Sequence, residues 1–358
     1  MKKILVILTG GTICSAPDTK SNNKNQSNAE FSKGYIIDGF YKSKSEFRDQ
    51  VEFDTIKLNP DILSENATIG FWNNLLLELK KEEIYTKYVG IIILHGTDTL
   101  AFTSSMLSMV MAGAPIPIML VSSHLPLTKK ETINGKEYIV ENKKTNGYIN
   151  FNASVELMLN GIEPNVYVVY KNPKGKLYVH FGSQLLQCKN YSNLFESEGK
   201  ILSVNNNVKG ERFETDSFYL RKINKIDGGV LLISPYVGLD YSKFKLKGVR
   251  AVVHGTYHSD TVCVERKSKQ EKFGKNSILW LIKRCKKKGI PLILAPCDKD
   301  AYAYASTGDA LEFGAIALSK TTLELAYAKT VLGVSLNLKG KDLVDFLQKS
   351  INKEFIYK

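Results

Sequence analysis

The sequence predicts an α/β fold: a larger N-terminal domain with a doubly wound, mainly parallel sheet, followed by a smaller C-terminal α/β domain. Short apolar runs without charges alternate with helical patterns, as expected for strands covered on both faces by helices. The chain has 358 residues, more than one typical domain of about 100–200 residues. We predict an N-terminal domain at 1–205, a linker at 206–229 and a C-terminal domain at 230–358.

Each element follows from its local pattern. Buried strands are predicted at "ILVIL", "VGIIIL", "IPIMLV" and "VYVVY" (4–8, 89–94, 116–121 and 166–170). "FWNNLLLELKKEEI" (71–84) places its apolar residues on one helical face, and 100–111 predicts a more buried helix. The polar, aperiodic segment 204–229 predicts the interdomain connection. The second domain is predicted to contain strands at 230–234, 249–253 and 290–294, and helices at about 309–330 and 339–352.

Two polar insertions interrupt this pattern. "DTKSNNKNQSNAEFSKG" (18–34) is almost free of apolar residues and predicts a mobile segment, a candidate lid beside the first glycine turn. Residues 129–147 contain Asn134-Gly135 between strand-like residues, which predicts a two-residue hairpin on the surface.

Composition limits the function classes. The net charge is +13, but only six of the 49 basic residues are arginine, which argues against a nucleic-acid partner. The basic cluster at 283–289 ends a predicted helix, where cations followed by glycine are common. Five cysteines without a C-x-x-C pair predict a reduced cytoplasmic protein without a cysteine-rich metal site. No run approaches the length of a membrane span, and we interpret the apolar N-terminus as a buried strand rather than a signal peptide.

Two similar glycine turns end predicted strands. "LTGGTIC" (8–14) presents Thr12, and "ILHGTDTL" (93–100) presents Thr97 and Asp98. Because ligands of doubly wound sheets bind beyond the carboxyl ends of the strands, we predict that both turns face one crevice. Cys14 is an alternative nucleophile, although we interpret it as a small structural residue.

Several motifs together resemble the bacterial-type L-asparaginase family, particularly its short cytoplasmic branch. They are "TGGTI" (9–13), "GYI" (34–36), "SENATIGFW" (64–72), "HGTDT" (95–99), "NGYINFNAS" (146–154) and "STGDAL" (306–311). The resemblance implies an amidohydrolase that converts asparagine, or a close analogue, to aspartate and ammonia through a threonine acyl-enzyme. It also implies a small-molecule amide as substrate, no cofactor or metal, and self-association as a homodimer or homotetramer.

The resemblance also assigns roles to individual residues. The implied catalytic residues are Thr12 as nucleophile, Tyr35 as its assistant, and Thr97 with Asp98 to position water. The implied substrate-binding residues are Gly11, Ser64 for the α-carboxylate, Asp98 for the α-ammonium, and Ser123. Backbone N–H groups at the two glycine turns are candidate oxyanion donors. Structural alternatives are loop packing for Tyr35 and helix capping for Ser64 and Asp98.

Three segments depart from the family pattern. The family lysine lies in a segment of the type R-G-x-R-x-x-K, and its position falls here on Gln187 or Leu186 in "HFGSQLLQCKN" (180–190). Using Lys189 instead requires a register shift. His124 replaces a family amide, and it either restores acid–base capacity or packs. The loop "HGTYHSDT" (254–261) suggests a remodelled recognition loop more than a metal site.

Other function classes remain open. One alternative is an asparaginase-fold protein that binds a small ligand as a sensor, with weak or no turnover. Another is the asparaginase-like component of a tRNA-dependent amidotransferase, a family that places a further domain before its glycine-threonine motif. A dinucleotide-binding protein needs G-x-G-x-x-G after the first strand, and "TGGTIC" does not supply it.

Overall fold

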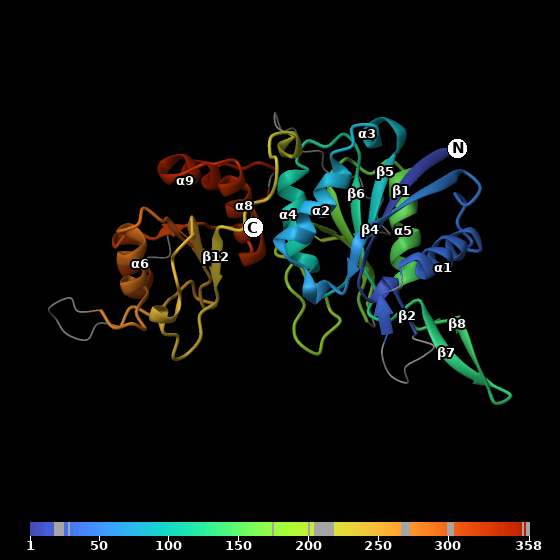
Figure 1. Cartoon of the computed structure of the whole chain (residues 1–358), viewed down its shortest axis with the longest axis horizontal. Coiled ribbons are helices and arrows are strands. Elements are labelled where there is room, and N and C mark those ends of the chain that lie inside the picture. Colours follow the sequence, from blue (N-terminus) through green and yellow to red (C-terminus); the bar gives the residue numbers. More distant parts are fainter. Residues whose placement is uncertain are drawn as a thin grey trace. The chain divides into compact units, whose positions relative to one another are not determined.

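The computed structural model describes residues 1–17, 25–27, 29–173, 175–199, 201–203, 218–265, 273–298, 304–352 and 354–355. The chain forms two compact units, Met1–Arg221 and Lys222–Lys358 (Figure 1). The unit boundary falls within the predicted linker, but much of that linker lies outside the described residues, so its limits stay a prediction. Among the described helices, none is both long and apolar enough to cross a membrane.

The first unit contains a seven-stranded sheet. In spatial order its strands are β11 (Ile201–Ser203), β10 (Leu177–Phe181), β9 (Val166–Lys171), β6 (Ile118–Val121), β5 (Gly90–Leu94), β1 (Lys2–Gly10) and β4 (Val51–Ile62). The pairings from β4 to β9 are parallel, and β10 and β11 extend the sheet in antiparallel pairings. The parallel strands follow the chain order 2-1-3-4-5, which is a doubly wound arrangement. The predicted fold class is therefore confirmed.

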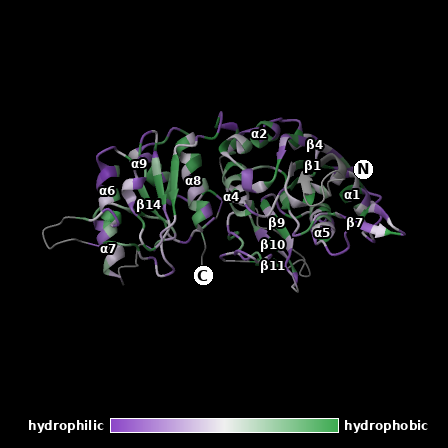
Figure 2. Cartoon of the chain, turned by 60° about the horizontal axis from the view of Figure 1, so that its bottom comes forward, coloured by the Kyte–Doolittle hydropathy of each residue, from purple (hydrophilic) through white to green (hydrophobic). Residues whose placement is uncertain are grey.

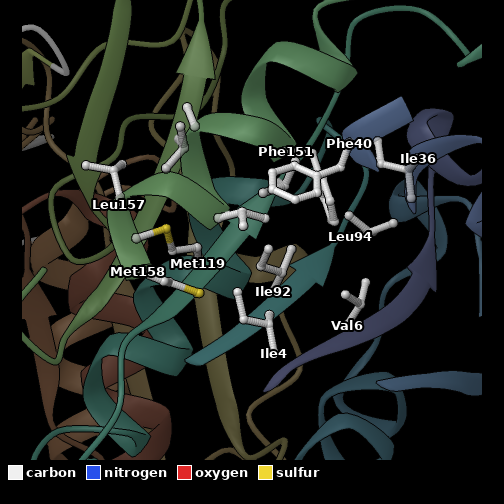
Figure 3. Close-up of a cluster of buried hydrophobic side chains, with 14 of the residues drawn as sticks. Ile4, Val6, Ile36, Phe40, Ile92, Leu94, Met119, Phe151, Leu157 and Met158 are labelled. Atoms are coloured by element: carbon white, nitrogen blue, oxygen red, sulfur yellow. The ribbon is translucent and has the colours of Figure 1, made fainter. Parts of the chain in front are cut away.

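Helices lie on both faces of this sheet (Figure 1). They are α1 (Ala29–Tyr41), α2 (Ile69–Leu79), α3 (Ile84–Lys87), α4 (Leu100–Val110) and α5 (Gly147–Leu159), with 3-10 turns η1 (Thr12–Cys14), η2 (Ser64–Asn66) and η3 (Tyr219–Arg221). Side chains of α1 and α5 pack on one face of the central strands, as Figure 3 shows for Ile36, Phe40, Phe151, Ile4 and Ile92. Successive residues of each strand point to opposite faces of the sheet. Because helices cover both faces, the continuous apolar runs contribute side chains to a hydrophobic core on each face.

Two small hairpins accompany the first unit. Strands β7 (Thr128–Ile133) and β8 (Lys136–Glu141) pair in antiparallel fashion around Asn134 and Gly135, whose φ angles are +51° and +76°. Positive φ at both central residues is what a type I′ turn requires, and it confirms the predicted hairpin. Strands β2 (Ser15–Pro17) and β3 (Asn25–Ser27) form the second hairpin.

The second unit contains a four-stranded parallel sheet (Figure 2). Its strands are β12 (Val230–Ile233), β13 (Ala251–His254), β14 (Leu292–Leu294) and β15 (Ile316–Ala317), and its helical elements are η4 (Tyr241–Lys243), α6 (Ile278–Lys286), α7 (Ala305–Glu312), α8 (Leu323–Ser335) and α9 (Gly340–Gln348). Figure 2 shows the strands around β14 as predominantly hydrophobic, whereas α6 carries hydrophilic residues. The basic end of α6 is a helix terminus, as predicted, with Gly289 at φ +65° beyond it.

Two element predictions need correction. The single helix predicted at 309–330 is instead two helices separated by β15, because the chain turns at Gly314 with φ +109°, a conformation that ends a helix. The helix predicted at 71–84 ends at Leu79 as α2, and α3 begins at Ile84. Strand β3 and the first residues of α1 fall within 18–34, whose mobility stays a prediction. Residues 18–24 and 28 lie outside the described residues.

Candidate active site

The two glycine turns lie at the same edge of the first sheet because β1 and β5 are neighbours. Leu8 is aligned with Leu94 in the parallel register, so both strands end at the same level. The Thr9 hydroxyl donates to the Leu94 carbonyl over 2.7 Å, which joins the two strand ends. Between β1 and β5 the order of the parallel strands reverses direction, and such a switch point is where doubly wound sheets bind ligands.

The turn that carries Thr12 depends on two glycines. Gly10 and Gly11 have φ angles of +115° and +77°, which L-residues with side chains rarely adopt. A Cβ atom on Gly11 would lie 2.3 Å from both Cα and N of Gly96, so the two turns touch backbone to backbone. The Gly11 N–H donates to the Ile62 carbonyl over 2.8 Å, and it is therefore engaged in the fold rather than an oxyanion donor. Thr12 itself is half-buried at the start of η1.

Ser64 joins the second turn to the end of β4. Its hydroxyl accepts from the Asp98 N–H at 3.2 Å and donates to the Asp98 carboxylate at 3.4 Å. Its carbonyl accepts from the Thr99 hydroxyl at 2.9 Å. A Cβ atom on Gly96 would lie 2.4 Å from the Ser64 Oγ, which again requires glycine. The structure thus brings Gly11, Ser64 and the turn carrying Thr97 and Asp98 together, with Ser64 buried and Asp98 exposed.

The other two predicted site residues are Tyr35 and Ser123. Tyr35 lies on α1, a helix that packs against η1. Ser123 follows β6 at the same sheet edge, but its buried hydroxyl donates to the Leu125 carbonyl over 2.7 Å. It would have to release that partner to contact a ligand.

Two buried groups near the turns are held in the neutral state. Burial raises the pKa of the Cys14 thiol to about 12, so this side chain is not a thiolate nucleophile at neutral pH. Burial likewise lowers the pKa of His95 to about 4. The His95 Nδ1 donates to the Gly96 carbonyl at 2.7 Å, and its ring packs edge-on against Phe71. Both residues support the turns structurally.

His124 is likewise held by its neighbours. Its Nδ1 lies 2.8 Å from the Asn146 Oδ1, which also accepts from the His124 main-chain N–H at 3.0 Å. The Asn146 amide donates in turn to the Lys171 carbonyl at 2.8 Å. Asn146 therefore positions the imidazole between the ends of neighbouring strands. These contacts favour the packing interpretation of His124.

A cavity of about 400 Å³ adjoins the second turn. Its wall consists of Thr97, Asp98, Gln187, Cys188, Lys189, Asn190, Tyr191, Ser192, Asn193 and Phe195. The Gln187 amide donates to the Asp98 carbonyl, so the segment after β10 lies directly against the turn. Sequence reasoning singled out Gln187 and Lys189 but missed residues 190–193 and Phe195.

The wall of this cavity includes one of the two candidates for the family lysine position. With Gly182 as the anchor, that position falls on Gln187 or Leu186. Gln187 lines the cavity with Thr97 and Asp98, and so does Asn193. Which residue takes the place of the lysine stays a prediction.

The loop 254–261 of the second unit is held by hydrogen bonds within the loop and to neighbouring segments. His254 is buried, its Nδ1 donates to the Gly255 carbonyl at 2.6 Å, and its Nε2 accepts from the Tyr241 hydroxyl at 2.9 Å. The Asp260 carboxylate accepts from the Asp298 N–H at 3.1 Å. Within the described part of the chain, no group of three or more His, Cys, Asp or Glu side chains is placed to hold a metal.

Solved structures share this architecture. The thermostable L-asparaginase from Thermococcus kodakarensis superposes with a TM-score of 0.76 at 20% identity, covering 99% of this chain and 100% of that one. L-asparaginase I from Vibrio cholerae gives a TM-score of 0.71 at 19% identity, covering 99% of both chains. At these identities the likeness concerns the fold.

Sequence comparisons find relatives over shorter stretches. The L-asparaginase of T. kodakarensis is 36% identical over 127 residues, 36% of this chain and 35% of that protein. One component of the glutamyl-tRNA(Gln) amidotransferase of Methanosarcina barkeri is 30% identical over 139 residues, 39% of this chain and 30% of that protein. The matches thus span about a third of these relatives. The family model "Asparaginase, N-terminal" matches residues 3–185, the stretch that contains both glycine turns and Ser64. The chain therefore belongs to the asparaginase family.

Proposed function

We propose that this protein is an amidohydrolase that hydrolyses the side-chain amide of asparagine to aspartate and ammonia. The observation that carries the proposal is the meeting of the two threonine-bearing turns through Gly11 and Gly96 at the switch point of the sheet. Family membership and the L-asparaginase relative support the same reaction class. The amidotransferase relative leaves the choice of amide to experiment.

The proposed reaction has two halves. The Thr12 hydroxyl attacks the amide carbon with Tyr35 as its proposed assistant, and the proton that Thr12 loses is transferred to the departing nitrogen, which leaves as ammonia. Water, positioned by Thr97 and Asp98, then attacks the resulting ester, and the Thr12 oxygen regains a proton as aspartate leaves. Ser64 and Asp98 are proposed to hold the α-carboxylate and α-ammonium of the substrate, and Gly11 and Ser123 to line its binding site. The hydrogen bonds that hold Ser64 and Asp98 in place before the reaction limit reorganisation in the transition state.

The decisive experiment measures ammonia release from L-asparagine, D-asparagine and L-glutamine by the wild type, Thr12→Ala and Thr97→Ala. We expect turnover of L-asparagine that both substitutions abolish. Thr132→Ala, at an exposed threonine of β7, is the matched control and retains full activity. Added hydroxylamine is expected to trap the acyl-enzyme as a hydroxamate in the wild type only.

The second candidate function is that of a small-ligand sensor. It is favoured by Gln187, which contacts the Asp98 turn. The family resemblance assigns the lysine position to Gln187 or Leu186, and a glutamine there cannot transfer a proton. Calorimetric binding of asparagine without ammonia release would support the sensor and contradict the hydrolase. A cytoplasmic location and self-association as a homodimer or homotetramer remain predictions from the family resemblance.

A further inference from the structure

The cavity beside Thr97 and Asp98 is larger than the proposed reaction alone explains. Its volume of about 400 Å³ lies within the range of pockets that hold whole small ligands, about 300–1,000 Å³. Neither Thr12 nor Ser64 belongs to its wall, although both are proposed to contact the asparagine moiety. The cavity therefore offers room beside the asparagine position for a second chemical group.

The segment that forms this wall is held in place by its own hydrogen bonds. The Cys188 thiol donates to the carbonyls of Ser192 and Leu194 at 3.0 and 3.3 Å. Asn172 exchanges two hydrogen bonds of 2.8 Å with the main chain of Phe195. Because these contacts order the segment before any ligand arrives, binding in the cavity requires little further loss of conformational entropy.

The wall carries one residue of each charge. Asp98 is the acid, Lys189 is the amine, and the amides of Asn190 and Asn193 add neutral donors and acceptors. The Lys189 side chain is 83% exposed, and its ammonium lies 3.8 Å from the Glu196 carboxylate, at the outer limit of an ion pair. Exposed pairs of this kind contribute little to stability. Lys189 can therefore exchange Glu196 for a ligand anion at little cost.

We propose that this cavity binds an anionic extension of the substrate. The preferred substrates are then asparaginyl compounds extended at the α-nitrogen by a carboxylate-bearing group, such as a dipeptide with an acidic first residue. The inference rests on the proposed function, in which Asp98 holds the α-nitrogen. Since Asp98 and Lys189 share one wall, a group attached to that nitrogen enters the cavity, and its carboxylate pairs with the Lys189 ammonium. Asp98 then accepts the peptide N–H instead of an ammonium.

The test compares kcat/KM for ammonia release from Asp-Asn, Ala-Asn, Lys-Asn and free asparagine. We expect the wild type to prefer Asp-Asn over Ala-Asn about tenfold or more, as for one charge-assisted hydrogen bond. Lys189→Gln reduces this ratio to about one. Lys189→Glu reverses the preference towards Lys-Asn. Lys136→Gln, at an exposed lysine of β8, is the matched control and retains the wild-type ratio.

The outcomes separate this inference from the proposed function. Turnover of free asparagine with equal kcat/KM for Asp-Asn and Ala-Asn overturns the inference and leaves the hydrolase standing. If no compound releases ammonia, the proposed hydrolase function is overturned. Titration calorimetry with the same compounds then measures their binding and tests the proposed role of the cavity. A Lys189-dependent preference for Asp-Asn in binding then supports the inference, and equal affinities for Asp-Asn and Ala-Asn overturn it.

Discussion

Ser64 and Asp98 form two hydrogen bonds to each other although 34 residues separate them in the chain. One bond fixes the main chain of the second glycine turn, and the other orients the carboxylate that we propose to bind the substrate ammonium. A single buried hydroxyl thus couples the end of β4 to the loop after β5.

Replacing Ser64 by alanine removes both bonds to Asp98. We expect kcat/KM for asparagine to fall about tenfold to a hundredfold, which corresponds to the loss of about 1–3 kcal/mol when a buried N–H loses its partner. Steady-state ammonia release measures the effect. Ser335→Ala, which removes a comparable side-chain to main-chain bond in the second unit, is expected to leave kcat/KM unchanged. Unchanged kcat/KM in Ser64→Ala would contradict the assigned role.

Replacing Gly96 by alanine tests how closely the turns approach each other. In Gly96→Ala the new Cβ would meet the Ser64 Oγ at 2.4 Å, so Ser64, the turn or both must shift. We expect a loss of most activity and about 1–3 kcal/mol of unfolding free energy, as for other overpacked sites. Gly34→Ala, at an exposed α1 position with no atom within 4 Å of its Cβ, should be neutral or slightly stabilising. Comparable activity in the two variants would show that the turns do not pack this tightly.

Asn193→Lys tests whether an amine in the cavity assists the proposed hydrolysis. An amine at 193 would enter the cavity that Thr97 and Asp98 line, where it can assist proton transfer from the attacking water that we propose Thr97 positions. We expect kcat for asparagine to rise, about tenfold or more. Gln50→Lys, which adds the same charge at an exposed site, controls for net charge. A kcat no higher than that of the control would show that an amine at this position does not assist the reaction.

The C-terminal segment is anchored by a buried ion pair between Lys329 and Glu354, whose side chains are 1% and 0% exposed and lie 2.5 Å apart. Lys329→Met leaves the Glu354 carboxylate buried without its partner, which should cost about 3–5 kcal/mol of stability. The double variant Lys329→Met/Glu354→Leu should recover much of that loss, because no charge then remains unpaired. Urea unfolding measures both. Lys81→Ala, which breaks an exposed pair with Glu78, should cost less than about 1 kcal/mol.

Three buried histidines predict how stability depends on pH. Burial lowers the folded-state pKa of His95, His180 and His254 from 6.5 to about 4. The unfolded chain therefore binds more protons between these values, and the unfolding free energy falls as the pH drops through the same window. Each histidine contributes a slope of about 1.4 kcal/mol per pH unit.

Urea titrations at a series of pH values and constant ionic strength measure this dependence. His180→Gln should reduce the slope, whereas His258→Gln, at an exposed position, should preserve it. An unfolding free energy that does not change across the window would show that these rings are protonated in the folded protein.

Features that depend on neighbouring residues along the chain could be predicted from the sequence. The apolar runs identified β1, β5, β6 and β9 because strands covered on both faces exclude polar side chains. The two glycine turns were recognisable because positive φ angles and close backbone contacts tolerate few residues other than glycine. Asn134-Gly135 identified its hairpin for the same conformational reason. The interruption of the predicted 309–330 helix was missed, because a short strand such as β15 is stabilised by its pairing with β14.

Only the tertiary structure decided which distant residues meet. That Gly11 contacts Gly96, that Ser64 reaches Asp98, and that Gln187 approaches the same turn depends on strand order and register, which the packing of the whole sheet determines. The protonation of His95 and the pairing of Lys329 with Glu354 depend on burial, since desolvation acts through the surroundings rather than through sequence neighbours. Residues 190–193 and Phe195 form part of the cavity wall. Their place beside Thr97 depends on the contact of Asn172 with Phe195 across the fold as well as on local hydrogen bonds from Cys188.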